Sequence, residues 1–267
     1  FTSPRGGTNW AEAAHLWYYS GLASRETDLN RKRERLGKAL EVAPDTLKRA
    51  ENSRYLGSKQ EVHVMFAGVL RELAKLEASP EEKKRLLEEA LEHRKESVRL
   101  TDQLQPFFYI NRGVMWNYLA EVKAELSSVE MDPENRRKMV EDAVSDKERC
   151  LQLCVRENSY REKMGNLSYF PTLGRFQYSH GELLNNLYEL THSNEHQRKA
   201  IRAFEEAAES FQKLDLASRV AECYWKVARS YNALDEHLKA AENFNAASNN
   251  YESAAEKIPQ LRDFYQN

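Results

Sequence analysis

The sequence predicts an all-α fold built from about five helical hairpins. The first observation is composition: the 267 residues contain 30 Leu and 28 Ala, but only 13 Val, seven Thr and three Ile. Helices favour Leu, Ala, Glu, Lys and Arg, whereas sheets favour β-branched side chains. The second and third observations are two internal repeats, each with apolar residues at helical spacing. Together they exclude an extensive β-sheet.

The first repeat lies in the middle of the chain. Residues 80–91 and 133–144 align without a gap, and each segment opens with a proline followed by a glutamate. Proline is well tolerated in the first turn of a helix, and a carboxylate there interacts favourably with the helix dipole. Apolar pairs then recur every three to four residues, as on one buried helix face. Helices are therefore predicted to begin near Pro80 and Pro133.

The second repeat lies nearer the C-terminus and alternates small and large side chains. Antiparallel helices approach closely where an alanine faces the partner, and a neighbouring aromatic ring fills the remaining space. The repeat therefore predicts two more packed hairpins. Its first copy is Ala200, Phe204, Ala207 and Phe211, and its second is Ala240, Phe244, Ala247 and Tyr251.

The predicted elements follow in order along the chain. A first hairpin is expected to end before Pro44, and a short helix is expected over 45–54. Residues 158–173 contain Gly165 and Pro171 and show no helical period, which favours an ordered loop, either a packed connection or a lip beside a binding surface. The five hairpins are expected at residues 8–43, 57–105, 107–157, 172–214 and 216–258.

The last of these hairpins resembles a known repeat. Its residues reproduce the spacing of the tetratricopeptide repeat (TPR), and the first hairpin resembles it more loosely. The resemblance implies a single domain over 1–267 that forms a right-handed α-α superhelix (solenoid), TPR-like and divergent in repeat length. The residues that carry it are Tyr224, Val227, Ala228, Tyr231, Ala240, Phe244 and Ala247, and in the first hairpin Leu16, Tyr19, Leu36, Ala39, Leu40 and Pro44.

Charge and cysteine content narrow the function classes. Basic and acidic residues number 40 and 42, giving a formal net charge of −2. A nucleic-acid-coating protein is usually clearly basic, so the sequence argues against nucleic acid as the main partner. The longest apolar run, 64–70, is too short to span a membrane. Three cysteines predict no disulfide framework and a reducing, cytoplasmic location.

The sequence shows no clear catalytic or metal-binding motif. Cys150 and Cys154 share a predicted helix face, but no second pair follows, so buried thiols are favoured over a metal site. A turn at 193–195 separates His192 from His196, which argues against shared ligation of a metal. Neither a nucleophile elbow nor a phosphate-binding glycine loop occurs in the sequence. The prediction is a protein without enzyme activity, cofactor or metal.

The resemblance places a candidate binding surface on the first helices of the hairpins. In TPR proteins these helices line a concave face that binds peptides or partner helices. The matching positions combine aromatic rings with amides and charged groups, which suits a recognition surface. The alternative for Trp17 and Trp225 is packing between repeats. The candidates are Trp17, Val64, Asn117, Glu121, Asn185, Glu189, Trp225, Arg229 and Asn232.

Three functions are therefore compatible with the sequence. The first is a protein–protein interaction module, scaffold or adaptor that binds a peptide or helix of another protein, or a neighbouring domain, on its concave face. The second is a sensor or regulatory TPR segment of a larger signalling ATPase or protease. The third is an RNA-binding helical-repeat protein whose basic residues cluster in space despite the balanced net charge.

Overall fold

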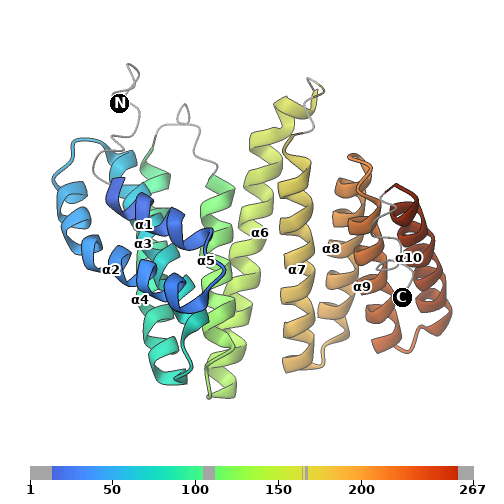
Figure 1. Cartoon of the computed structure of the whole chain (residues 1–267). Coiled ribbons are helices and arrows are strands. Elements are labelled where there is room, and N and C mark those ends of the chain that lie inside the picture. The colour runs from blue at the N-terminus through green and yellow to red at the C-terminus, as the bar shows by residue number, and fades with distance from the viewer. Residues whose placement is uncertain (1–13, 105–111, 164, 166–167, 258–267) are drawn as a thin grey trace. The chain divides into compact units, whose positions relative to one another are not determined.

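The computed structural model describes residues 14–104, 112–163, 165 and 168–257. All regular secondary structure in these residues is helical, as the sequence predicts, and consecutive helices run up and down (Figure 1). The described helices are α1 (Ala14–Ser24), α2 (Leu29–Glu51), α3 (Leu56–Leu76), α4 (Pro80–Gln103), α5 (Arg112–Ser127), α6 (Pro133–Lys163), α7 (Phe170–Thr191), α8 (Asn194–Gln212), α9 (Ala217–Ala233) and α10 (His237–Lys257).

The helices group into two compact units, Phe1–Met139 and Val140–Asn267, with the boundary inside α6. In the first unit, α1 to α4 share an apolar core to which α5 contributes Val122 and Leu126. Side-chain caps start two of its helices: Asp28 accepts a hydrogen bond from the backbone N–H of Arg31, and Ser79 accepts one from that of Glu82. The single domain predicted from the repeats stays a prediction.

In the second unit, α7 packs against α8 with small residues facing large rings. A Cβ atom on Gly181 would lie 2.6 Å from the Phe204 ring, and one on Gly174 would lie 2.7 Å from the Phe211 ring. Ala200 is fully buried on the same side of α8 as Phe204. The small–large alternation in the sequence thus corresponds to real close packing between these helices.

Two predicted boundaries are wrong. Helix α2 does not end before Pro44 but continues to Glu51, so the separate helix predicted over 45–54 is its last part. The predicted loop 158–173 is shorter, because α6 runs to Lys163 and α7 begins at Phe170. Pro171 lies in the first turn of α7, where the missing N–H of proline leaves no helical hydrogen bond unmade.

Some predictions fall outside the described residues, namely the hairpin starts at 8–13 and 107–111.

In the fifth hairpin Phe244 is 41% exposed, whereas its repeat counterpart Phe204 is fully buried. Within the part of the chain that the structure describes, no helix is both long enough and apolar enough to cross a bilayer.

Candidate functional site

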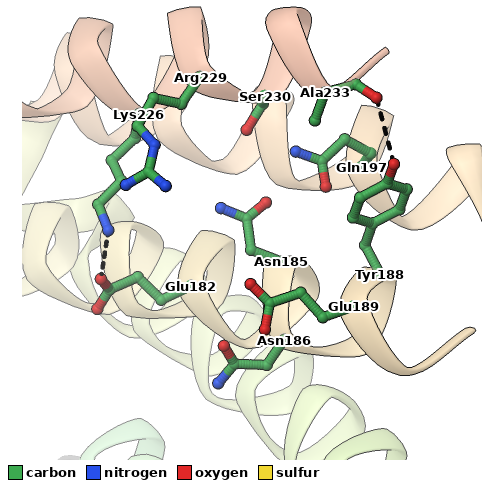
Figure 2. Close-up of a pocket in the computed structure, with 10 residues that line it drawn as sticks. All are labelled: Glu182, Asn185, Asn186, Tyr188, Glu189, Gln197, Lys226, Arg229, Ser230 and Ala233. Atoms are coloured by element: carbon green, nitrogen blue, oxygen red, sulfur yellow. Dashed lines mark hydrogen bonds and ion pairs between the residues drawn. The ribbon is translucent and has the colours of Figure 1, made fainter. Parts of the chain in front are cut away.

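The first helices of the fourth and fifth hairpins, α7 and α9, form a polar pocket in the second unit, which we call the α7–α9 pocket (Figure 2). Its volume is about 200 Å³. Nine of its lining residues come from α7 and α9, and one comes from the first turn of α8. They are Glu182, Asn185, Asn186, Tyr188, Glu189, Gln197, Lys226, Arg229, Ser230 and Ala233.

Helical periodicity places these side chains together. On α7, Glu182, Asn185 and Glu189 are three and four residues apart and therefore share one face. The opposite face of α7 carries buried leucines, including Leu184 and Leu187. On α9, positions 226, 229, 230 and 233 form the equivalent face. Burial of the apolar faces thus turns the polar faces of α7 and α9 toward the same space.

Two contacts tie α7 to α9 at the edge of the pocket (Figure 2). The Lys226 Nζ lies 2.9 Å from Glu182 Oε1, and the Tyr188 hydroxyl donates a hydrogen bond of 3.2 Å to the Ala233 carbonyl oxygen. Lys226 also lies 5.8 Å from the ring centre of Tyr178, a side chain whose burial raises the pKa of its hydroxyl well above the ordinary value. The edge of the pocket is therefore held by side chains from both helices.

Trp225 lies beside the pocket on α9. The Arg229 guanidinium carbon is 4.9 Å from the centre of the Trp225 ring, a cation–π distance. Trp225 remains 39% exposed, so part of its apolar surface next to the pocket is available to solvent. An exposed aromatic ring next to a polar pocket is the composition of a recognition surface.

Three buried oxygen atoms in the pocket have no hydrogen-bond partner among the described residues: Asn185 Oδ1, Gln197 Oε1 and Ser230 Oγ. Gln197 is only 3% exposed and Ser230 is fully buried. Figure 2 shows the three side chains, one from each of α7, α8 and α9, directed toward a common space. An unmade hydrogen bond of a buried polar group costs about 1–3 kcal/mol, so such a cluster requires an explanation.

The structure brings together three of the residues predicted for the concave face in this unit. Asn185, Glu189 and Arg229 all line the pocket, and Trp225 lies next to it. Asn232 lies on the last turn of α9 outside the pocket lining, where its Oδ1 is 3.1 Å from Nδ1 of His237.

In the first unit, the predicted face residues make internal contacts. Asn117 is buried and donates a hydrogen bond of 2.8 Å to Glu121 Oε1. Glu121 also pairs with Arg71 of α3, as does Glu125, so this network joins α3 to α5. Val64 packs against the buried cluster that contains Val98 and Met115.

Trp17 lies on α1 and is 47% exposed. It is therefore not fully enclosed by neighbouring repeats in the described residues.

Sequence reasoning missed Gln197 and Ser230. Gln197 precedes Ile201 by one helical turn, and Ser230 follows Val227 by three residues, so both polar side chains lie on buried helix faces. The available signal was a polar residue at a position where helical periodicity expects an apolar one.

The sulfur atoms of Cys150 and Cys154 are buried and lie 4.0 Å apart. A break in the helix does separate the two histidines, but it lies at 192–193 instead of 193–195, because α7 ends at Thr191 and α8 begins at Asn194. His196 contacts the Thr191 hydroxyl at 2.9 Å, while His192 packs edge-on against Tyr188.

Solved structures with similar folds are TPR-like repeat proteins. BtubC (BKLC) from P. vanneervenii shares 14% sequence identity at a TM-score of 0.51, covering 91% of this chain and 87% of that one. A protein of Podosopora anserina, described as a kinesin light chain with nearly identical TPR-like repeats, shares 14% identity at a TM-score of 0.53, with coverage of 90% and 97%. At these identities the similarity shows the fold alone, which is a TPR-like helical repeat.

Comparison with curated proteins finds no match. The profile of one family does match, over residues 121–265, which is more than half of the chain and includes every residue of the α7–α9 pocket. That profile describes the soluble NSF attachment protein, SNAP. The chain therefore belongs to the SNAP family of TPR-like helical-repeat proteins.

Proposed function

We propose that this chain is a non-catalytic adaptor that binds a peptide or helix of a protein partner on the face formed by α7 and α9. The observation that carries the proposal is the α7–α9 pocket, where three predicted face residues, Asn185, Glu189 and Arg229, converge beside the exposed ring of Trp225.

The fold and the family support this class of function. TPR-like repeats and the SNAP family are typically non-catalytic adaptors, and a TPR-like fold suggests protein partners. The SNAP family is named for attachment to NSF, so purified NSF is the first partner to test.

The chemistry of the surface suits peptide recognition. Exposed aromatic rings supply most of the binding energy at such surfaces, while amides donate to and accept from a partner and set its register. In this proposal Trp225 supplies the apolar anchor, and Asn185 supplies polar contacts from the opposite helix. The Lys226–Glu182 ion pair joins α7 to α9 at the edge of this surface.

Site-specific photo-crosslinking tests the proposed face. A photo-crosslinking residue is placed at Asn186 on α7 or at Asn232 on α9, and in matched controls at Asn245 or Glu252 on α10; all four side chains are exposed. Irradiation with purified NSF should give crosslinks from α7 and α9 but not from α10. Crosslinks only from α10, or none from any position, would contradict the proposal.

A further inference from the structure

We propose that the α7–α9 pocket binds a carboxamide side chain, Asn or Gln, presented by the protein partner. This inference deepens the proposed function and rests on it, because the pocket lies on the face assigned to the partner.

The three unpaired oxygen atoms define which hydrogen-bonding groups the ligand must carry. Gln197 and Ser230 are 3% and 0% exposed, and with Asn185 they leave three buried oxygens without a hydrogen-bond partner in the described residues. An amide side chain both donates and accepts, and so does a hydroxyl group. The unpaired atoms of Asn185 and Gln197 are amide oxygens, which only accept, whereas the Ser230 hydroxyl can accept or donate. The ligand must therefore carry at least two donors, and an acceptor on it can pair with the Ser230 hydroxyl.

The charges around the pocket favour a neutral ligand. Lys226 is paired with Glu182 at 2.9 Å, and the other two charged lining residues, Arg229 and Glu189, have opposite signs. A carboxylate or a guanidinium group would introduce a net charge into a pocket whose charges already balance. Because an uncompensated charge is costly to remove from water, the balanced lining disfavours both.

A carboxamide meets these requirements. It is neutral and offers one carbonyl acceptor and two N–H donors. The two N–H groups can donate to Asn185 Oδ1 and Gln197 Oε1, and the carbonyl oxygen can accept from the Ser230 hydroxyl. The pocket volume of about 200 Å³ can accept such a group. The exposed ring of Trp225 beside it offers apolar surface to the methylene groups of the side chain.

Small probes separate the ligand classes. Propionamide, propionate and ethylguanidinium are titrated into the full chain labelled with ¹⁵N, and the side-chain NH₂ signals of Asn185 and Gln197 are followed by NMR. Propionamide should give saturable shifts with a dissociation constant in the millimolar range, as expected for a five-atom ligand. Propionate and ethylguanidinium should bind at least about tenfold more weakly. Tighter binding of either charged probe, or no saturable shift with propionamide, would overturn the inference.

Stability measurements distinguish a ligand-binding site from a structural network that water completes. Gln197→Leu removes a buried carbonyl oxygen that lacks a partner, so it should raise the melting temperature by about 2–4 °C while abolishing the propionamide shift of the Asn185 signal. Ser230→Ala should also raise the melting temperature. The matched control is Gln177→Leu on α7, because Gln177 is also buried but accepts a hydrogen bond of 2.6 Å from Ser210. That variant should lower the melting temperature and leave propionamide binding intact.

The opposite stability result would overturn the inference. If Gln197→Leu lowers the melting temperature as Gln177→Leu does, the Gln197 amide is already satisfied, and no ligand is needed to explain it.

The two proposals can fail separately. If NSF crosslinks to α7 and α9 but binds Gln197→Leu as tightly as the wild type, the adaptor function stands and the carboxamide site is wrong. If NSF does not contact this face, the adaptor proposal is wrong for that partner, while the propionamide titration still decides the chemistry of the pocket.

Discussion

Gly181 in α7 is adjacent to the fully buried ring of Phe204. A Cβ atom at position 181 would lie 2.6 Å from that ring, closer than carbon atoms approach in folded proteins. We therefore predict that Gly181→Ala lowers the free energy of unfolding by about 1–3 kcal/mol, because overpacking outweighs the better helix propensity of alanine. Urea unfolding followed by circular dichroism measures the change.

Gly37 in α2 provides the control. Nothing lies within 4 Å of a Cβ atom placed there, so only helix propensity should change. Gly37→Ala should stabilise the protein by up to about 1 kcal/mol. Equal effects of the two substitutions would show that the close approach of α7 to α8 carries no packing constraint.

The pair His63 and His93 predicts a pH dependence at the residue scale. Their Nδ1 atoms are 2.8 Å apart, and the His93 ring also contacts Phe66. Burial, together with the neighbouring His63, lowers the pKa of His93 to about 4, while burial also lowers the pKa of His63. Both imidazoles are therefore neutral in the folded protein over a pH range in which they are protonated in the unfolded chain.

The lowered pKa values of His63 and His93 determine how stability changes with pH. The stabilising contribution of the neutral imidazoles is complete above the unfolded histidine pKa near 6.5. It is lost as the pH falls from there toward 4. We expect the loss attributable to His93 to be on the order of 1 kcal/mol, since the ring is partly solvent-exposed and its interactions are screened. Urea unfolding at several pH values should show a flatter dependence for His93→Gln than for the wild type. Identical pH profiles would contradict this account.

At the scale of elements, α2 contains an interior proline. Pro44 lacks the N–H that would bond to the Leu40 carbonyl, yet the helix continues to Glu51, with Ala43 and Thr46 buried on either side. Tertiary burial of this segment thus overrides the local break. Pro44→Ala should restore the bond, which raises the free energy of unfolding by about 1–3 kcal/mol. The unfolded chain becomes more flexible without the proline, and this offsets about 0.4–1 kcal/mol of the gain.

Chemical denaturation measures the effect of Pro44→Ala. An unchanged or reduced stability would contradict the prediction and would show that packing of Ala43 and Thr46 requires the proline geometry.

The sequence predicted helix starts better than helix ends. Pro80 and Pro133 begin α4 and α6 as expected, because first-turn proline and carboxylates act locally. The end predicted at Pro44 was wrong because packing, which is not local, decides whether an interior break is tolerated. The loop predicted over 158–173 was too long for the same reason, because Pro171 lies in the first turn of α7 instead of in a loop.

At the scale of the whole molecule, repeat spacing predicted part of the candidate site. Asn185, Glu189 and Arg229 could be placed on one face because their helices repeat a known pattern, and the structure places them around one pocket. Gln197 could not be placed there, because α8 is a second helix of its hairpin and its first turn reaches the pocket only through the tertiary fold.

Binding of a protein partner on the face formed by α7 and α9 can be measured by calorimetric titration of purified NSF into the chain. The double variant Trp225→Ala with Asn185→Ala removes the exposed ring and an amide whose buried oxygen lacks a partner, so it should bind NSF at least about tenfold more weakly. Its far-UV circular dichroism and melting temperature should stay within about 2 °C of the wild type, because neither side chain is fully buried. Unchanged affinity, or unfolding of the double variant, would contradict the claim.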